Sequence, residues 1–302
     1  MPEKYQHHHD GESNGEHLLF AVPKKGRLYE TVTKLLSGSG IEYVRKERLD
    51  IAHSKNLPIS IVFLPAADIA AYVGEGNVDM GITGEDIIAE SQVHLETLLK
   101  LGVGKCNLSV QAPAMSAEVE DVRKFAGKRI VTSFPNITRD FFAQYETGTP
   151  TKVKLVSGSV EAACGLGLAD AIVDLVETGT TMKAAGLEEA AVVLRSETVL
   201  IANPNSKHKE LIEPIRQRIA GYLTSQTWLV VTYNVQRSSL PMVTRITPGK
   251  RSPTITQLES PNWVAVQALV PKSEAAAIMD QLHAAGATDI LLTGLLSARM
   301  GD

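Results

Sequence analysis

The sequence has 302 residues, of which 44% are apolar and 21% charged, a composition ordinary for a soluble globular protein of two or three domains. Its net charge of −4 argues against a general nucleic-acid or membrane binder, and no run of about 18 apolar residues is present to span a membrane. Two cysteines, Cys106 and Cys164, cannot build a disulfide framework and fit a reducing, cytoplasmic compartment.

The amino-terminal region combines a polar leader with a first strand and helix. Residues 1–16 lack the apolar core of a signal peptide and are predicted to be a disordered leader. The apolar run Leu18 to Val22 predicts the first strand of a parallel sheet, and Leu28 to Leu36 has helical spacing. The basic turn between them, Pro23-Lys24-Lys25-Gly26-Arg27, lies where open α/β sheets bind anions, although lysines on a turn are more often simply solvated.

The next segments continue a first α/β lobe. They predict an exposed strand or hairpin at Tyr43–Asp50, a strand at Pro58–Leu64, a helix at Ala66–Val73, a short strand at Val78–Gly84 and a helix at Glu85–Glu90. A glycine turn between a strand and a helix N-terminus indicates a phosphate-sized pocket near Gly81–Gly84.

A second lobe is predicted to begin at the strand within Lys105–Ala114. Its expected elements are the helix Val119–Ala126, the strand Arg129–Thr132, the helix Ile137–Tyr145, the strand Val153–Val156, a helix at Glu161, the strand Ala171–Leu175 and a helix at Thr180. One long strand, Ala190 to Ala202, is then predicted to lead back to the first lobe. Such a return makes a cleft between two lobes, as in periplasmic binding proteins.

The stretch Glu161–Met182 carries the strongest functional signal. Asp174 interrupts a buried strand at its carboxyl end, where α/β sheets place ligand groups. The turn Thr178-Gly179-Thr180-Thr181 follows, and its backbone N–H groups and hydroxyls can form a nest for a phosphate. An acid for sugar hydroxyls beside an anion cradle indicates a sugar phosphate. Taken alone, the turn is more often a simple turn with an N-cap.

The remaining chain is predicted to form one more helix and then a separate domain. His208–Thr224 is predicted to be a helix that packs on the first lobe. A βαββαβ order, the ferredoxin-like plan, then follows from the strand Trp228–Val235, the helix Leu240–Ile246, the strands Thr254–Leu258 and Trp263–Val270, the helix Ser273–Ala285 and the strand Asp289–Leu292. The module is predicted to bind an effector, with a pure dimerisation module as the alternative. The fold class is therefore α/β: a two-lobed, periplasmic-binding-protein-like core plus an ACT-like βαββαβ domain.

Ten positions of the stretch that contains Asp174 resemble the signature of the ATP phosphoribosyltransferase family. They are Glu161, Gly167, Ala169, Ile172, Asp174, Leu175, Thr178, Gly179, Thr181 and Met182. Three further segments are similar to motifs of that family, namely Pro23–Leu28, Arg48-Leu49 and Val73–Asp86. The resemblance covers nearly all of residues 18–302 and is to the long form of the family.

The resemblance implies transfer of a phosphoribosyl group from phosphoribosyl pyrophosphate to N1 of ATP, the first step of histidine biosynthesis. Asp174 and Glu161 would hold the ribose hydroxyls, and Asp174 would also balance developing positive charge. Glu177 and the loop Thr178-Gly179-Thr180-Thr181 would clasp the 5-phosphate. The expected contacts of the pyrophosphate are Lys25, Arg27 and Arg48, with Arg45 and Lys46 as alternatives to Arg48. Magnesium would bridge the pyrophosphate without a dedicated protein cage.

In the long form, the last domain binds histidine as an inhibitor, which makes Asn234, Ser252 and Thr254 the expected regulatory contacts, and a dimer or hexamer is expected. The implied domains are a leader (1–16), a first catalytic lobe (17–109 with 200–226), a second catalytic lobe (110–199) and a regulatory domain (227–302). Two other hypotheses stay open: a two-lobed solute-binding module without catalysis, against which the missing export signal counts, and a regulatory subunit that has lost its site.

Overall fold

The computed structural model describes residues 17–46, 49–116 and 118–300, so the expected leader at 1–16 lies outside the described residues. The chain forms two compact units. One consists of residues up to Val32 together with Glu42–Ile212, and the other of Thr33–Ile41 together with the residues from Glu213 onward. No helix among the described residues is long and apolar enough to cross a membrane.

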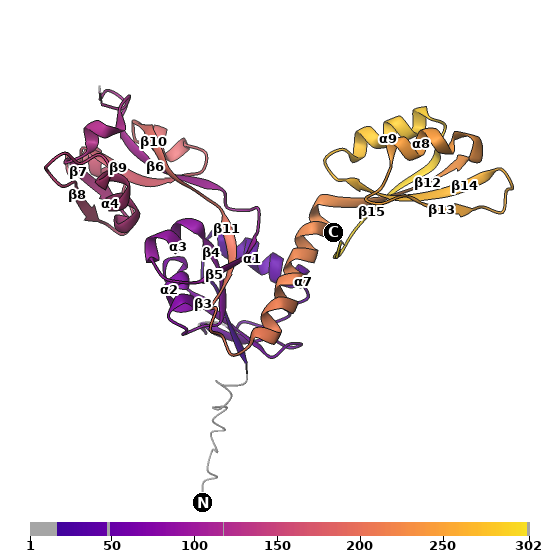
Figure 1. Ribbon diagram of the computed structural model, residues 1–302, viewed down its shortest axis with the longest axis horizontal. Coiled ribbons are helices and arrows are strands. Elements are labelled where there is room, and N and C mark those ends of the chain that lie inside the picture. The colour runs from indigo at the N-terminus through magenta and orange to yellow at the C-terminus, as the bar shows by residue number, and fades with distance from the viewer. Residues whose placement is uncertain (1–16, 47–48, 117, 301–302) are drawn as a thin grey trace, which may run out of the picture. The chain divides into compact units, whose positions relative to one another are not determined.

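The first lobe is built on a six-stranded sheet in the order β2-β3-β1-β4-β11-β5 (Figure 1). Its strands are β1 (Leu18–Pro23), β2 (Ile51–His53), β3 (Ile59–Leu64), β4 (Met80–Gly84), β5 (Glu96–Lys100) and β11 (Thr198–Ala202). The strand β1 runs parallel to β3 and β4 and continues into α1 (Arg27–Gly38). The apolar sides of α2 (Ile69–Gly74) and α3 (Glu85–Ser91) pack on one face of this sheet.

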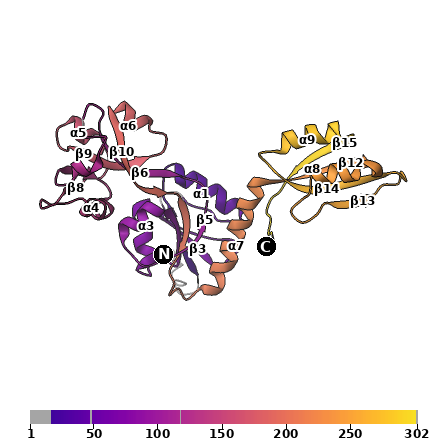
Figure 2. The same cartoon turned by 45° about the horizontal axis from the view of Figure 1, so that its top comes forward.

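The second lobe has a five-stranded sheet in the order β10-β6-β9-β7-β8. Its strands are β6 (Cys106–Pro113), β7 (Arg129–Thr132), β8 (Lys152–Leu155), β9 (Ala171–Val176) and β10 (Leu187–Ser196). The helix α4 (Pro135–Ala143) packs on one face, and α5 (Ala162–Gly165) and α6 (Thr180–Ala184) lie on the other (Figure 2). Alternate residues of β9 therefore reach two different cores, with Val173 in one and Ile172 in the other.

The chain passes between these two sheets twice, first from β5 to β6 and then from β10 to β11. The prediction of one long strand over Ala190–Ala202 is wrong, because the chain changes sheets at Glu197. Ser196 pairs with Cys106 in the second sheet, whereas Thr198 pairs with Gly84 in the first. Apolar residues lie on both sides of the polar segment Arg195–Thr198, and no glycine or proline marks the switch in the sequence.

The carboxy-terminal domain has the βαββαβ order and a four-stranded antiparallel sheet ordered β13-β14-β12-β15, in agreement with the ferredoxin-like plan. Its elements are β12 (Trp228–Gln236), α8 (Leu240–Ile246), β13 (Thr254–Gln257), β14 (Trp263–Pro271), α9 (Ala275–Ala284) and β15 (Thr288–Gly294). The two helices bury one face of the sheet around Tyr233, Val266 and Leu282, and α7 (Lys209–Thr227) precedes the domain.

Two predicted elements of the catalytic lobes differ from the structure. The helix expected at Val119–Ala126 is only a short 3₁₀ turn, η2 (Val122–Phe125), which Asp121 caps by accepting a hydrogen bond from the Arg123 backbone N–H. In the segment expected to be a strand or hairpin at Tyr43–Asp50, the described residues form only one bridge, between Tyr43 and Ser54. A second 3₁₀ turn, η1 (Ala66–Asp68), precedes α2, and η3 (Arg237–Ser239) precedes α8.

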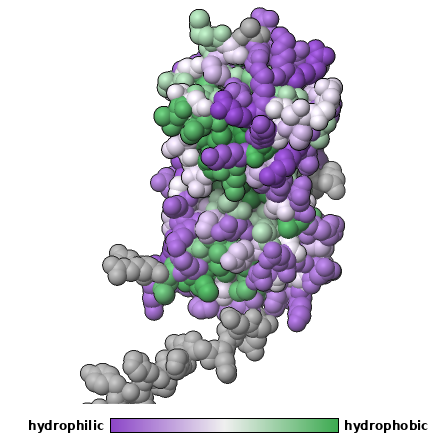
Figure 3. Space-filling view, turned by 90° about the vertical axis from the view of Figure 1, so that its left-hand side faces the viewer, coloured by the Kyte–Doolittle hydropathy of each residue, from purple (hydrophilic) through white to green (hydrophobic). Residues whose placement is uncertain are grey.

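Large apolar side chains that the second lobe exposes include Leu155, Leu166 and Leu168. Seen from the side of this lobe, apolar patches lie between hydrophilic side chains (Figure 3). Leu166 and Leu168 belong to the segment that joins Glu161 to Asp174, whereas Ala163 and Ala169 of the same segment are buried in the core.

Candidate active site and regulatory pocket

Asp174 lies where the buried part of β9 ends. Ala171, Ile172 and Val173 are fully buried, and Asp174 is half-buried. Its Oδ1 accepts a hydrogen bond of 2.8 Å from the Leu175 backbone N–H. Burial raises the pKa of the Asp174 carboxyl, the hydrogen bond from Leu175 lowers it by a smaller amount, and the charge of Glu161 raises it by less still. Glu161 is thus near enough for its charge to act on Asp174.

The loop after β9 is held open by a glycine. Gly179 has φ +75°, a left-handed conformation that favours glycine, and precedes the first residue of α6. The hydroxyls of Thr178 and Thr180 lie 3.0 Å apart, and Thr178, Thr180 and Thr181 are exposed. Because α6 has only five residues, the chemistry of this loop comes from its own hydroxyls and N–H groups rather than from a long helix dipole.

The basic loop after β1 reaches the loop after β9. Arg27 Nη1 donates a hydrogen bond of 2.9 Å to Glu177 Oε2, and both side chains are largely exposed, at 91% and 58%. Lys25 lies exposed on the same loop, next to Gly26 with φ +86°. Arg27 and Glu177, expected on opposite ends of the substrate, are thus direct neighbours.

Arg48 lies outside the described residues, and its alternative Arg45 is engaged by the protein itself. The Arg45 guanidinium lies 3.9 Å from the centre of the Phe63 ring and donates to the Leu49 carbonyl at 3.0 Å. It also pairs with Asp50, which in turn pairs with Lys24 at 2.6 Å. Burial of most of its side chain and these contacts indicate that Arg45 holds the basic loop in shape rather than binding a substrate.

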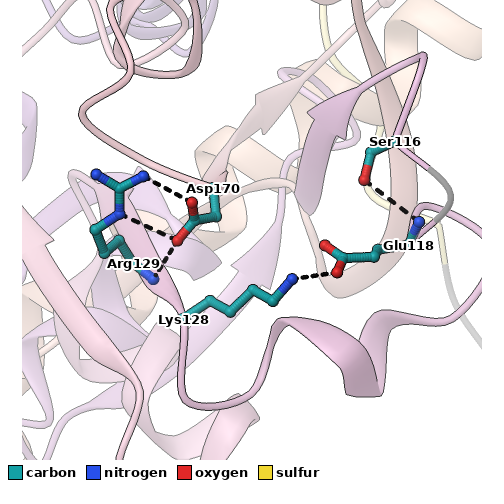
Figure 4. Close-up of polar contacts among 5 residues, drawn as sticks. All are labelled: Ser116, Glu118, Lys128, Arg129 and Asp170. Atoms are coloured by element: carbon teal, nitrogen blue, oxygen red, sulfur yellow. Dashed lines mark hydrogen bonds and ion pairs between the residues drawn. The ribbon is translucent and has the colours of Figure 1, made fainter.

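A second arginine, absent from the sequence predictions, fixes the segment before Asp174. Arg129 donates through Nη2 to Asp170 Oδ1 at 2.7 Å and through Nε to Asp170 Oδ2 at 3.2 Å (Figure 4). Its Nη1 also donates to the Gly167 carbonyl at 2.9 Å. The Arg129 guanidinium keeps the pKa of the Asp170 carboxyl below its usual value. This bidentate pair anchors the apolar segment between Glu161 and Asp174 to β7.

Two of the three expected regulatory residues line one cavity. Ser252 and Thr254 line a cavity of about 440 Å³ on the carboxy-terminal domain, whereas Asn234 does not. In the sheet, Asn234 is opposite Ala265 and Thr254 is opposite Gln267, so the two are separated by two strands and two residues, about 12 Å. Asn234 instead donates to Asp289 Oδ2 at 3.0 Å.

Taken together, these features define a class of protein: a two-lobed α/β core with the architecture of periplasmic binding proteins, an acid and an anion loop at one strand end, and an appended ferredoxin-like domain. A family model described as ATP phosphoribosyltransferase matches residues 65–221, and one described as HisG, C-terminal domain, matches residues 225–296. The chain belongs to the ATP phosphoribosyltransferase family, which confirms the resemblance seen in its sequence.

Individual relatives agree with this assignment. The ATP phosphoribosyltransferase of Schizosaccharomyces pombe is 47% identical over 94% of this chain and 97% of its own length. That of Saccharomyces cerevisiae is 44% identical with the same coverage. Among solved structures, the ATP phosphoribosyl transferase (HisG:HisZ) complex from Thermotoga maritima matches 67% of this chain and 98% of its own, with a TM-score of 0.58 and 27% identity. The activity is the transfer of a phosphoribosyl group to ATP, which opens histidine biosynthesis.

Proposed function

We propose that phosphoribosyl pyrophosphate binds with its 5-phosphate on the loop Thr178–Thr181 and its ribose hydroxyls on Asp174 and Glu161. The observation that carries this proposal is the half-buried Asp174 carboxyl next to an exposed loop that Gly179 keeps in a left-handed turn. Backbone N–H groups and hydroxyls in such a turn suit phosphate oxygens. Glu177 completes the loop, and its pairing with Arg27 supports placing the pyrophosphate at Lys25 and Arg27, with Arg48 as a further contact.

The chemistry then needs positioning and charge control more than a base. The lone pair of adenine N1 attacks C1 of the ribose while the bond from C1 to the pyrophosphate oxygen breaks on the opposite face. Positive charge develops on the sugar ring, and an ionised Asp174 stabilises it. Arg27 and Lys25 take up the negative charge that leaves with the pyrophosphate. Each of these residues therefore stabilises a charge that develops during the reaction, on the sugar ring or on the pyrophosphate.

We infer that Mg²⁺ arrives with the pyrophosphate. Among the residues that the structure describes, no three His, Cys, Asp or Glu side chains lie close enough to hold a metal ion. Mg²⁺ keeps substrate oxygens and waters in its coordination shell, so the pyrophosphate itself can carry the ion. When bound, it supplies charge neutralisation of the leaving group. Chelation by EDTA is expected to abolish turnover, and full activity in a metal-free sample would contradict this.

We propose that histidine inhibits the enzyme through the carboxy-terminal domain, with Asn234, Ser252 and Thr254 as contacts. The hydrogen bond of Asn234 with Asp289, which also accepts from the Thr288 hydroxyl at 3.1 Å, offers a carboxylate to the cationic groups of histidine. Self-association as a dimer or hexamer in the cytoplasm is part of the same proposal. The exposed Leu291 on the sheet supports self-association, and the two free cysteines support a reducing compartment. Sedimentation with and without histidine measures the assembly, and a monomer under both conditions would contradict it.

The decisive assay mixes the protein with ATP, phosphoribosyl pyrophosphate and Mg²⁺ and follows adduct formation by near-UV absorbance, with and without histidine. An adduct that histidine does not suppress would remove the regulatory part alone. The loop assignment is tested by Thr178→Val combined with Thr181→Val. This variant is expected to raise the KM for the sugar phosphate far more than the KM for ATP, and equal effects would mean that another ligand occupies the loop.

A further inference from the structure

Gln111 is a polar residue buried on β6, beside the strand that carries Asp174. It is only 2% exposed, and its Nε2 donates a hydrogen bond of 3.1 Å to the Asp174 backbone carbonyl. In the sheet, β6 pairs with β9, and Gln111 is opposite Ile172. A buried amide needs a partner, because leaving it without one costs its full desolvation penalty. Gln111 finds that partner on the backbone of the proposed catalytic acid.

The bond from Gln111 is made to the peptide group that joins Asp174 to Leu175. The carbonyl and the N–H of a trans peptide lie in one plane and point in opposite directions. This carbonyl accepts from Gln111, and the N–H of the same peptide group donates to Asp174 Oδ1 at 2.8 Å. A donor that fixes the carbonyl therefore also fixes the direction of the N–H that holds the carboxylate.

On the other side of β9, the neighbouring strand ends before it reaches this peptide group. Thr132 is the last residue of β7 and is opposite Val173. Its hydroxyl donates to the Val173 carbonyl at 2.7 Å and accepts from the Phe134 backbone N–H at 2.9 Å, where the chain leads into α4. The Leu175 N–H thus bonds to the carboxylate of Asp174, beyond the point where β7 pairs with β9.

We propose that Gln111 is a positioning residue, which holds the peptide group between Asp174 and Leu175 in the plane that directs the Asp174 carboxylate toward the ribose. The inference rests on the role of Asp174 in the proposed function. Hydrogen bonds to one peptide group polarise one another, so the bond from Gln111 also strengthens the bond from Leu175. The bond from Leu175 lowers the pKa of Asp174 against the effect of burial. Loss of the Gln111 donor should therefore misdirect the carboxylate and raise its pKa.

Gln111→Met tests this role, because methionine is similarly long and unbranched but has no donor. Activity that needs an ionised Asp174 is lost as the pH falls through its pKa, and the substrates titrate identically in both proteins. A hydrogen bond to a charged group can move a pKa by about one to two units, so its partial loss is expected to move the acid limb of kcat/KM to higher pH by about 0.5–1 unit.

The same variant separates direction from ionisation at pH 8, where Asp174 is ionised in both proteins. There kcat should fall at least about tenfold, because a shift of about 1 Å in a catalytic group can cost about 100-fold. The KM for phosphoribosyl pyrophosphate should change less than kcat does, since the loop Thr178–Thr181 is intact.

The charged side chains around Asp174 are the same in the variant and the wild type. Glu161 acts on the pKa of Asp174 through its charge, and Glu177 on the following loop is engaged in an ion pair. On the side of β6, Glu189 accepts a hydrogen bond of 2.6 Å from the fully buried Ser109. A difference between the two pH profiles therefore reports the lost donor.

Ser109→Ala is the matched control. Ser109 lies on the same strand, opposite Asp174, but its hydroxyl bonds to Glu189. This variant should leave the acid limb in place, and a shift as large as that of Gln111→Met would overturn the proposal. Gln111→Asn keeps the amide on a side chain that is one methylene shorter. It should move the limb in the same direction, and it decides the question if the methionine variant does not fold.

A titration without substrate separates this inference from the proposed function. Carbon-13 NMR of protein labelled at its aspartate carboxyls measures the pKa of Asp174, whose signal is assigned by its absence in Asp174→Asn. A higher pKa in Gln111→Met than in the wild type supports the proposal, and an unchanged pKa overturns it. If Asp174→Asn turns over as fast as the wild type, the proposed function fails, whereas the titration still decides whether Gln111 controls the carboxylate.

Discussion

Gly179 is the sharpest test of the phosphate loop. Its φ of +75° costs an alanine about 1–2 kcal/mol, because the added Cβ disfavours the left-handed region. That Cβ would lie 3.7 Å from Met182 Cε and 3.9 Å from Val176 Cγ1, which are ordinary contacts. The penalty of Gly179→Ala is thus conformational rather than steric. If the loop changes its backbone conformation to avoid this penalty, the N–H groups of Thr180 and Thr181 turn away from the ligand.

The variant is expected to raise the KM for phosphoribosyl pyrophosphate by about 5- to 30-fold, the factor that corresponds to 1–2 kcal/mol, while the KM for ATP stays within about twofold. Initial rates of adduct formation at varied concentrations of each substrate measure both constants. Gly186→Ala is the matched control. This residue follows α6 at φ +69°, and its Cβ would meet nothing within 4 Å, so it pays the same penalty away from the loop.

Two results would refute this reasoning. If Gly186→Ala raises the KM for the sugar phosphate as much as Gly179→Ala, the effect is loss of stability near α6 and not loss of a phosphate cradle. If Gly179→Asn, which tolerates a left-handed backbone, is as impaired as the alanine variant, backbone conformation is not the cause.

Three further predictions follow from the site and its supports. Asp174→Asn should abolish turnover yet stabilise the fold at neutral pH. Burial raises the pKa of Asp174, so the stability that its neutral form provides is complete at acidic pH and is lost as the pH rises through that pKa. Thermal unfolding of the variant and the wild type at pH 7 and at pH 3.5 should therefore show a gain in stability only at pH 7. Cys106, whose pKa burial and the charge of Asp86 raise to about 11, should react with iodoacetamide far more slowly in the folded protein than in urea at pH 8, and equal rates would contradict its burial. Glu90 accepts hydrogen bonds from the backbone N–H groups of Asn136 and Ile137 at the start of α4, so Glu90→Ala should destabilise the catalytic core by about 1–2 kcal/mol in urea unfolding and Glu90→Gln, which keeps an acceptor, by clearly less.

Elements that an apolar run or a helical spacing of neighbouring residues marks were predictable from the sequence. The run Ala171–Leu175 corresponds to β9, which is one residue longer, and Leu240–Ile246 matches α8 in both bounds. Burial on both faces makes β9 uniformly apolar, and the acid that breaks the run marks the point where the strand leaves the core. The βαββαβ order was likewise visible, because turn residues separate strands and helices of ordinary length.

Contacts between distant positions were not predictable in this way. Arg129 and Asp170 are 41 residues apart, and Glu90 and Asn136 are 46 apart, so no spacing rule connects them. The regulatory residues show the same limit: Asn234, Ser252 and Thr254 look like one set in the sequence, but strand order places Asn234 apart from the other two. Only the register of the sheet reveals this separation.

The ion pair between Arg27 and Glu177 shows how the two loops can serve a substrate that carries negative charge at both ends. Each side chain is largely exposed, and an exposed pair contributes only about 0–1 kcal/mol, so little is lost when a ligand replaces it. A pyrophosphate offers Arg27 more charge and more acceptor atoms than one carboxylate does. A 5-phosphate on the neighbouring loop would repel Glu177 and weaken the pair from its other side. In the proposed placement, both ends of the same substrate favour releasing Arg27 to the leaving group, which would explain why a carboxylate lies next to the proposed anion site.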